Sequence, residues 1–171
     1  MEPKELTLGK FAMNYGIILG LIMILISVIT YVTGLALEGA QWPNWIYYAA
    51  FPLIIFYAIN QFKKENLNLL SLSQALKIGV LIGVISAIVI MIYSMIFNYV
   101  IDPEFMSQMM EVAKDKMLEN PKMTEEMVDQ SMKFIEMFSN PAISGAFMIA
   151  MSAVFGLIYA LIGGLIMKRE E

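Results

Sequence analysis

The sequence of 171 residues contains no cysteine and no histidine. The lack of cysteine excludes disulfides, thiolate metal ligands and a cysteine nucleophile. The lack of histidine removes the commonest metal ligand and the usual base at neutral pH. Charged residues are also few, at 15%, whereas 59% of the residues are hydrophobic. Because soluble domains hold about 25% charged residues, this composition predicts an integral membrane protein.

Long apolar runs make up most of the chain. A helix of about 20 apolar residues crosses the hydrocarbon core of a bilayer, and the runs predict four such spans. Pro52 lies inside the second span, where a proline removes a backbone donor and predicts a kink. The sequence therefore predicts an all-α integral membrane protein with a single membrane domain, residues 1–171. The expected spans cover approximately residues 11–37, 45–61, 76–101 and 142–167.

Ionisable residues are missing from the spans, except near their ends. Ion-coupled pumps, proton relays and voltage sensors place such groups at membrane depth despite the cost. Intramembrane proteolysis needs a nucleophile with a base, a pair of aspartates, or a metal. We therefore expect no enzymatic activity, no catalytic residues, no metal, no cofactor and no bound nucleic acid. A small channel or transporter, lined by hydroxyl and backbone groups and possibly oligomeric, is the alternative function.

Basic residues near the span ends predict the orientation, because lysine and arginine are retained on the cytoplasmic side. The segment between spans three and four, residues 102–139, holds four lysines against nine acidic residues. We therefore expect both termini in the cytoplasm and this segment outside. The basic residues expected on the cytoplasmic side are Lys4, Lys10, Lys63, Lys64, Lys77, Lys168 and Arg169.

Small residues recur four positions apart in the first, third and fourth spans. In lipid, such pairs let helix backbones approach closely, so that dispersion contacts accumulate. We expect these rows to pack the helices of the bundle together, with homodimerisation through one of the rows as the alternative. The residues concerned are Gly16, Gly20, Gly79, Gly83, Ser152, Gly156, Ala160 and Gly164.

The outer segment, residues 102–140, predicts an amphipathic helical hairpin. Asp102 and Thr124 suit the starts of two helices, and apolar residues follow the helical period in each. The segment holds eight of the sixteen methionines, a residue that suits adaptable binding surfaces. Three contacts for the apolar stripe stay open: the two helices pack their halves of it against each other and over the outer end of the bundle, or it lies on the lipid surface, or it binds a partner protein. The stripe consists of Phe105, Met106, Met109, Val112, Met127, Met132, Phe134, Ile135 and Phe138.

Three stretches carry a family resemblance. They are "YGIILG" in the first span, the acidic "DPEFMSQMMEVAKDKMLENPKMTEEMVDQSMKF", and "NP" leading into a last span that ends "GGLIMKR". Over essentially its whole length the chain resembles the bacterial membrane proteins named domain of unknown function 4199. The resemblance implies four spans and a bacterial inner membrane, and it supplies no activity. We predict a multi-pass accessory or scaffold protein whose partners are the lipid bilayer and, through the hairpin, a protein or a second copy.

Overall fold

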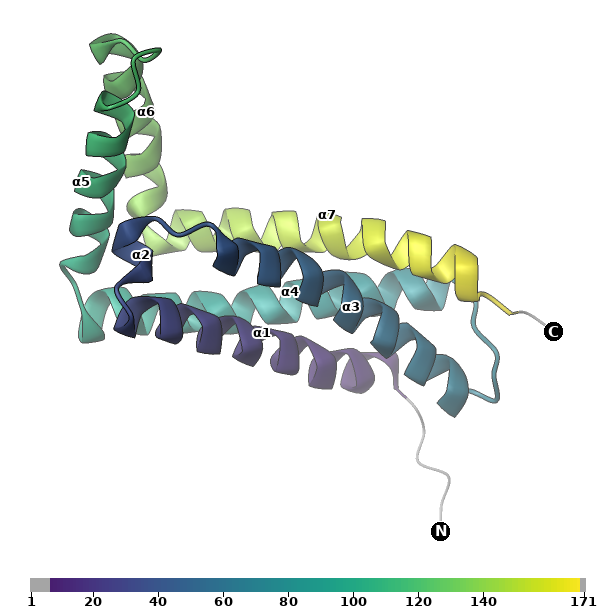
Figure 1. Ribbon diagram of the computed structural model, residues 1–171. Helices are drawn as coiled ribbons and strands as arrows, with labels where there is room; N and C mark the ends of the chain where they lie inside the picture. The colour runs from purple at the N-terminus through teal and green to yellow at the C-terminus, as the bar shows by residue number, and fades with distance from the viewer. Residues whose placement is uncertain (1–6, 170–171) are drawn as a thin grey trace.

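The computed structural model of the protein describes residues 7–169, so Lys4 lies outside the described part (Figure 1). Every element in that range is a helix, apart from one isolated bridge between Leu70 and Arg169. Four helices are long and apolar enough to cross a membrane. The expected all-helical, four-span architecture is confirmed, and the protein is a multi-pass helical membrane protein. The four helices are α1 (Leu8–Val32), α3 (Trp42–Glu65), α4 (Leu72–Ile96) and α7 (Pro141–Met167).

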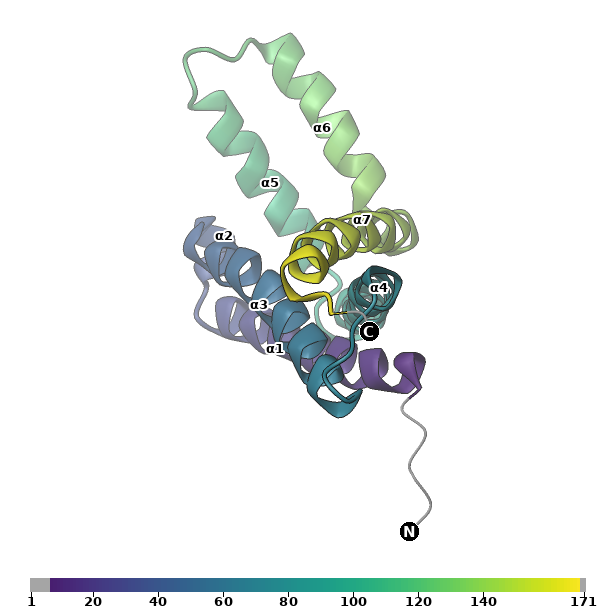
Figure 2. The same cartoon turned by 90° about the vertical axis from the view of Figure 1, so that its right-hand side faces the viewer.

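The four long helices run alongside one another, and α4 makes most of its contacts with α7 and α1 (Figures 1 and 2). The start of α1 and the end of α7 lie at the same end of the bundle as the connection between α3 and α4 (Figure 1). The bridge between Leu70 and Arg169 ties that connection to the end of α7. The lysines that flank the spans, other than Lys4, therefore belong to one end of the bundle.

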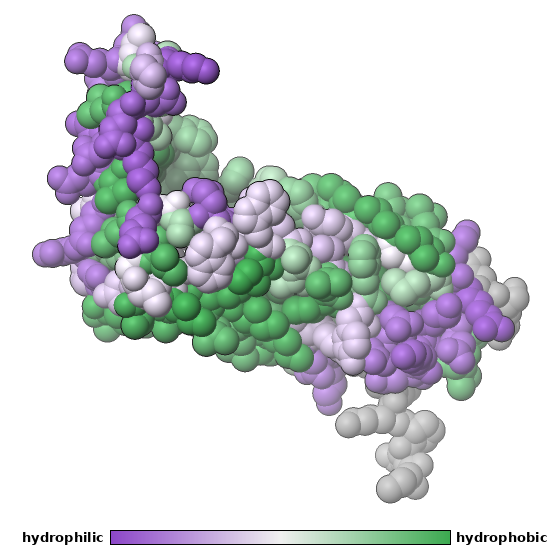
Figure 3. Space-filling model, in the orientation of Figure 1, coloured by the Kyte–Doolittle hydropathy of each residue, from purple (hydrophilic) through white to green (hydrophobic). Residues whose placement is uncertain are grey.

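Two short helices, α5 (Phe105–Leu118) and α6 (Glu125–Ser139), form the expected hairpin between α4 and α7. The hairpin stands crosswise to the axis of the bundle, at the end opposite the start of α1 and the end of α7 (Figures 1 and 2). Hydrophilic residues gather on the hairpin and at the far end of the bundle, with a hydrophobic surface between them (Figure 3). This distribution is the one expected of a bundle whose middle crosses a bilayer.

Side-chain caps fix where several helices begin. Ser71 and Gln74 form a reciprocal capping box at the start of α4, with distances of 3.2 and 2.9 Å. Thr124 accepts from the backbone N–H of Met127 at 3.3 Å and opens α6. Asn140 accepts from the N–H of Ala142 at 2.9 Å, with Pro141 as the first residue of α7. Each cap satisfies a backbone donor that the helix itself leaves free.

Helix boundaries differ from the expected spans at several places. The first span ends at Val32 and not near residue 37, because Gly34 takes a left-handed conformation (φ +75°) and starts a separate turn, α2 (Leu35–Glu38). The second extends further on both sides, from Trp42 to Glu65. α4 ends in a π-helical turn, η1 (Phe97–Ile101). Pro52 lies within α3, which continues through it as one helix, and the expected kink stays a prediction.

Candidate functional site

The rows of small residues lie along two seams that both involve α4. On α1, a side-chain carbon added at Gly16 would lie 2.7 Å from Cβ of Ile85, and one at Gly20 would lie 2.7 Å from Cγ1 of Val89. These distances are shorter than real carbon atoms tolerate. α1 and α4 therefore approach so closely that only glycine fits at the two positions.

The second seam joins α4 to α7, backbone against backbone. A carbon added at Gly79 would lie 2.5 Å from the Gly156 carbonyl oxygen and would also meet Ala160, while one at Gly83 would meet the Ser152 carbonyl. Gly164 continues the row against Leu72 and Ala75. All eight predicted packing positions are buried within the single chain, so a second copy would have to use another surface.

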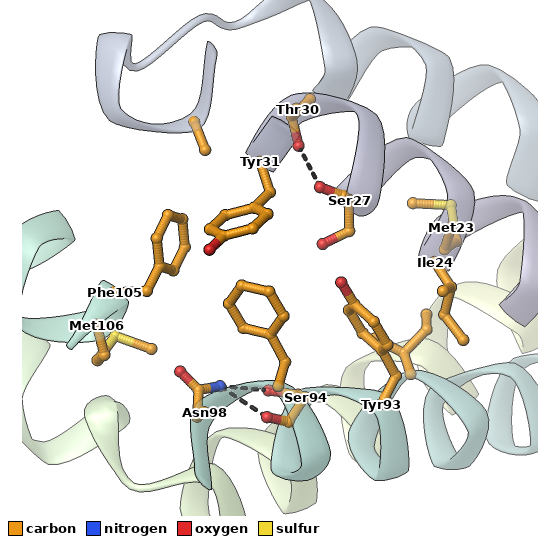
Figure 4. Close-up of a pocket in the computed structure, with 13 residues that line it drawn as sticks. Met23, Ile24, Ser27, Thr30, Tyr31, Tyr93, Ser94, Asn98, Phe105 and Met106 are labelled. Atoms are coloured by element: carbon orange, nitrogen blue, oxygen red, sulfur yellow. Dashed lines mark hydrogen bonds between the residues drawn. The ribbon is translucent and has the colours of Figure 1, made fainter. Parts of the chain in front are cut away.

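A pocket opens beyond Gly20, where the row of small residues on α1 ends. The next residue in the row after Gly16 and Gly20 is Ile24, whose side chain prevents the same close approach. A cavity of about 240 Å³ follows between the outer halves of α1 and α4 (Figure 4). It is lined by Met23, Ile24, Ser27, Thr30, Tyr31, Ala36, Ile90, Tyr93, Ser94, Phe97, Asn98, Phe105 and Met106.

The polar groups of the pocket come from hydroxyls and one amide. Asn98 Nδ2 donates to the Ser94 carbonyl oxygen at 2.8 Å and to Ser94 Oγ at 3.2 Å. Asn98 Oδ1 is buried and accepts no hydrogen bond from any described residue. On the facing helix, Thr30 Oγ1 donates to the carbonyl of Ser27 at 2.9 Å. Since the lining residues are all uncharged, the pocket suits water or a small neutral molecule.

Three aromatic rings that line the pocket hold the base of the hairpin. Tyr31, Phe97 and Phe105 pack edge to face, with ring centroids 4.9 to 5.3 Å apart. The Tyr31 hydroxyl donates to Asp102 Oδ2 at 2.9 Å, and Asp102 Oδ1 accepts from the backbone N–H of Phe105 at 3.1 Å. Asp102 thus caps a turn before α5, which begins at Phe105, and at the same time joins α5 to α1. Further along α5, Lys116 Nζ donates to the carbonyl of Glu38 in α2.

The two halves of the predicted stripe face each other across the hairpin. Val128 of α6 is only 1% exposed, and the neighbouring stripe residues Met109, Val112, Met132 and Ile135 are half-buried. Phe105 and Met106 instead line the pocket at the base of the hairpin. Most of the stripe is therefore at least half-buried within the protein.

Three apolar residues of α6 are left uncovered: Met127, Phe134 and Met137 are 48%, 62% and 49% exposed. Phe134 contacts Phe138, with ring centroids 5.0 Å apart, and Phe138 contacts Phe147 of α7 at 5.2 Å. Met127, Phe134 and Phe138, which we call the apolar edge, were predicted as part of one stripe. The structure separates them from the residues that face α5.

The pocket, η1 and the bond between Tyr31 and Asp102 are features that the sequence reasoning missed. Ser94 and Asn98 are four residues apart on α4, a spacing that places polar side chains on one helix face, and this signal was available. The aromatic cluster joins residues 31, 97 and 105, and no local pattern connects them. In residues 7–169 no group of three or more acidic residues lies close enough to hold a metal ion.

The chain belongs to the family described as "Protein of unknown function (DUF4199)", which matches residues 14–169. The match confirms the resemblance seen in the three sequence stretches. No curated protein and no solved structure matches the chain.

Proposed function

From this family membership and the fold, we propose a non-enzymatic accessory or scaffold protein of the bacterial inner membrane that binds a neighbouring protein through the α5–α6 hairpin. Both termini are placed in the cytoplasm and the hairpin outside. The support for this orientation is the clustering of Lys10, Lys63, Lys64, Lys77 and Lys168 at one end of the bundle, since such residues are retained on the cytoplasmic side. The proposal includes no catalysis because the spans offer no nucleophile with a base, no pair of aspartates and no metal site.

The observation that carries this proposal is the shape of the hairpin. α5 and α6 bury most of the stripe within the protein. They stand crosswise to the bundle, with α6 extending past α7 (Figures 1 and 2). A preformed surface of this kind loses little conformational freedom on binding, which favours affinity. The side of α5 that is turned away from the stripe offers exposed polar residues to a partner: Glu104, Ser107, Glu111, Lys114 and Asp115.

Photo-cross-linking in native membranes tests the proposal. A photoreactive amino acid replaces Ser107 or Glu111 on α5, and a matched variant carries it at Val154 of α7, a residue that is 49% exposed on the flank of the bundle. We expect a discrete protein adduct from the two α5 positions and none from Val154. Absence of a protein adduct at both α5 positions would refute a partner on this side of the hairpin.

A small channel or transporter is the second candidate, and the uncharged pocket between α1 and α4 is the observation that favours it. Directly beyond the pocket, however, Gly16 and Gly20 of α1 pack tightly against Ile85 and Val89 of α4, and a pathway would need this seam to open. Flux of ions or small neutral solutes into liposomes that contain the purified protein separates the candidates, because a scaffold produces none.

A further inference from the structure

The apolar edge of α6 points in a single direction. At about 100° per residue, Met127 and Phe134 lie within about 40° of Phe138 around the helix axis. By the same measure, the acidic residues Glu125, Asp129 and Glu136 lie about 140 to 180° away from Phe138. α6 therefore has an apolar side and an acidic side. Both are distinct from the side that packs against α5.

The contact with α7 fixes where the apolar side faces. Phe138 lies edge to face against Phe147, with 5.2 Å between the ring centroids. Phe147 is six residues into α7, which is about 9 Å along the helix from Pro141, and it is 54% exposed on the flank of the bundle. Phe138 thus points along the bundle axis toward the middle of the spans. Met127 and Phe134 point the same way.

The hairpin stands crosswise to the bundle, so it runs along the membrane surface when the long helices cross the bilayer (Figures 1 and 2). The rings of Phe134, Phe138 and Phe147 form a continuous row from the hairpin to the flank of α7. That flank is a lipid-facing surface in a four-span protein, with Ile143, Phe147 and Val154 exposed on it. The apolar edge continues this lipid-facing surface onto the hairpin.

We infer that α6 is an interfacial helix whose apolar edge lies on the lipids of the outer leaflet. This inference rests on the outward placement of the hairpin in the proposed function and concerns the opposite side of the hairpin from the one proposed to bind a protein. Interfacial helices bind through buried apolar area and through basic residues that attract anionic lipids. In α6 the only basic residue is Lys133, about 140° from Phe138, so the contact depends on apolar burial and not on lipid charge.

Site-directed spin labelling tests the inference, and the absence of native cysteine makes single labels simple to introduce. One variant, Phe134→Cys, carries the nitroxide on the apolar edge, and the matched control, Asp129→Cys, carries it on the acidic side of the same helix. Collision of each label with oxygen, which partitions into lipid, and with a water-soluble nickel chelate is measured in liposomes. A third variant, Met127→Cys, places a label on the edge nearer to the tip.

We expect a ratio of oxygen to nickel accessibility several-fold higher at positions 127 and 134 than at position 129. The ratios should be the same in phosphatidylcholine liposomes and in liposomes that contain phosphatidylglycerol. Equal ratios at positions 134 and 129, or a water-exposed label at position 127, would overturn the inference. A label at position 134 that neither reagent reaches would also overturn it, by showing a protein contact, while the adduct at Ser107 tests the proposed function separately.

Discussion

Replacing Gly83 by alanine tests the close contact between α4 and α7. An added Cβ would collide with the carbonyl oxygen of Ser152 and lie 2.9 Å from its carbonyl carbon. Both atoms belong to the backbone of α7, so no side chain can move aside and the two helices must separate. Overpacking of a well-packed core costs about 1 to 3 kcal/mol. Alanine in the middle of a helix regains up to about 1 kcal/mol relative to glycine.

The matched control is Gly9→Ala, because nothing lies within 4 Å of a carbon added at Gly9 and the gain in helix propensity largely cancels in the comparison. We expect Gly83→Ala to have a free energy of unfolding about 1 to 3 kcal/mol lower than Gly9→Ala. Its unfolding equilibrium constant is then about 5- to 150-fold larger. Titration of purified protein from mild detergent into SDS, followed by circular dichroism, measures the difference. Equal midpoints for the two variants would refute the assigned seam.

Three further predictions follow from the site. Tyr31→Phe keeps the ring but removes the hydrogen bond to Asp102, so we expect faster amide exchange over residues 105–118 with unchanged exchange in α4, and equal exchange in both proteins would contradict this role. Asn98→Leu removes a buried acceptor that has no partner among the described residues and also the two hydrogen bonds that Nδ2 donates to Ser94. Because each net hydrogen bond contributes about 0.5 to 1.5 kcal/mol, the free energy of unfolding should fall by at most about 3 kcal/mol, and a larger loss in the SDS titration would instead indicate a bound water or ligand. Asn120→Cys, in the connection between α5 and α6, should react with a membrane-impermeant maleimide in intact spheroplasts, and labelling only after lysis would reverse the orientation.

The sequence was sufficient to predict the two helices of the hairpin and their amphipathic character. Thr124 predicts a helix start through a local hydrogen bond, and this cap forms as expected. The expected cap at Asp102 is wrong by position, because Asp102 caps only a turn and α5 begins at Phe105. Apolar periodicity identifies one side of a helix, but it does not say which neighbour covers that side. For this reason Phe134 and Ile135 were predicted on the same stripe, whereas Ile135 is half-buried and Phe134 stays exposed.

Prediction from the sequence was less complete for the bundle and the pocket. Spacing alone marks Gly16 and Gly79 as packing positions but does not show that the first faces Ile85 and the second faces Gly156. The end of the first span was misplaced because the residues after Val32 are apolar, and hydropathy does not register that Gly34 turns the chain. The aromatic cluster that lines the pocket depends on the close approach of α1, η1 and α5, which is a property of the whole fold.

The hairpin keeps one side toward the membrane only if it is prevented from rotating. Its attachments to the bundle prevent that rotation. At the α5 end, the rings of Tyr31, Phe97 and Phe105 make three edge-to-face pairs, and each such pair contributes about 0.5 to 1.5 kcal/mol beyond burial. At the α6 end, the chain passes into α7 within one residue, Asn140, and Phe138 rests on Phe147. Two attachments on separate helices prevent rotation about either one. The direction of the apolar edge is therefore set by the bundle and does not depend on the loop between α5 and α6.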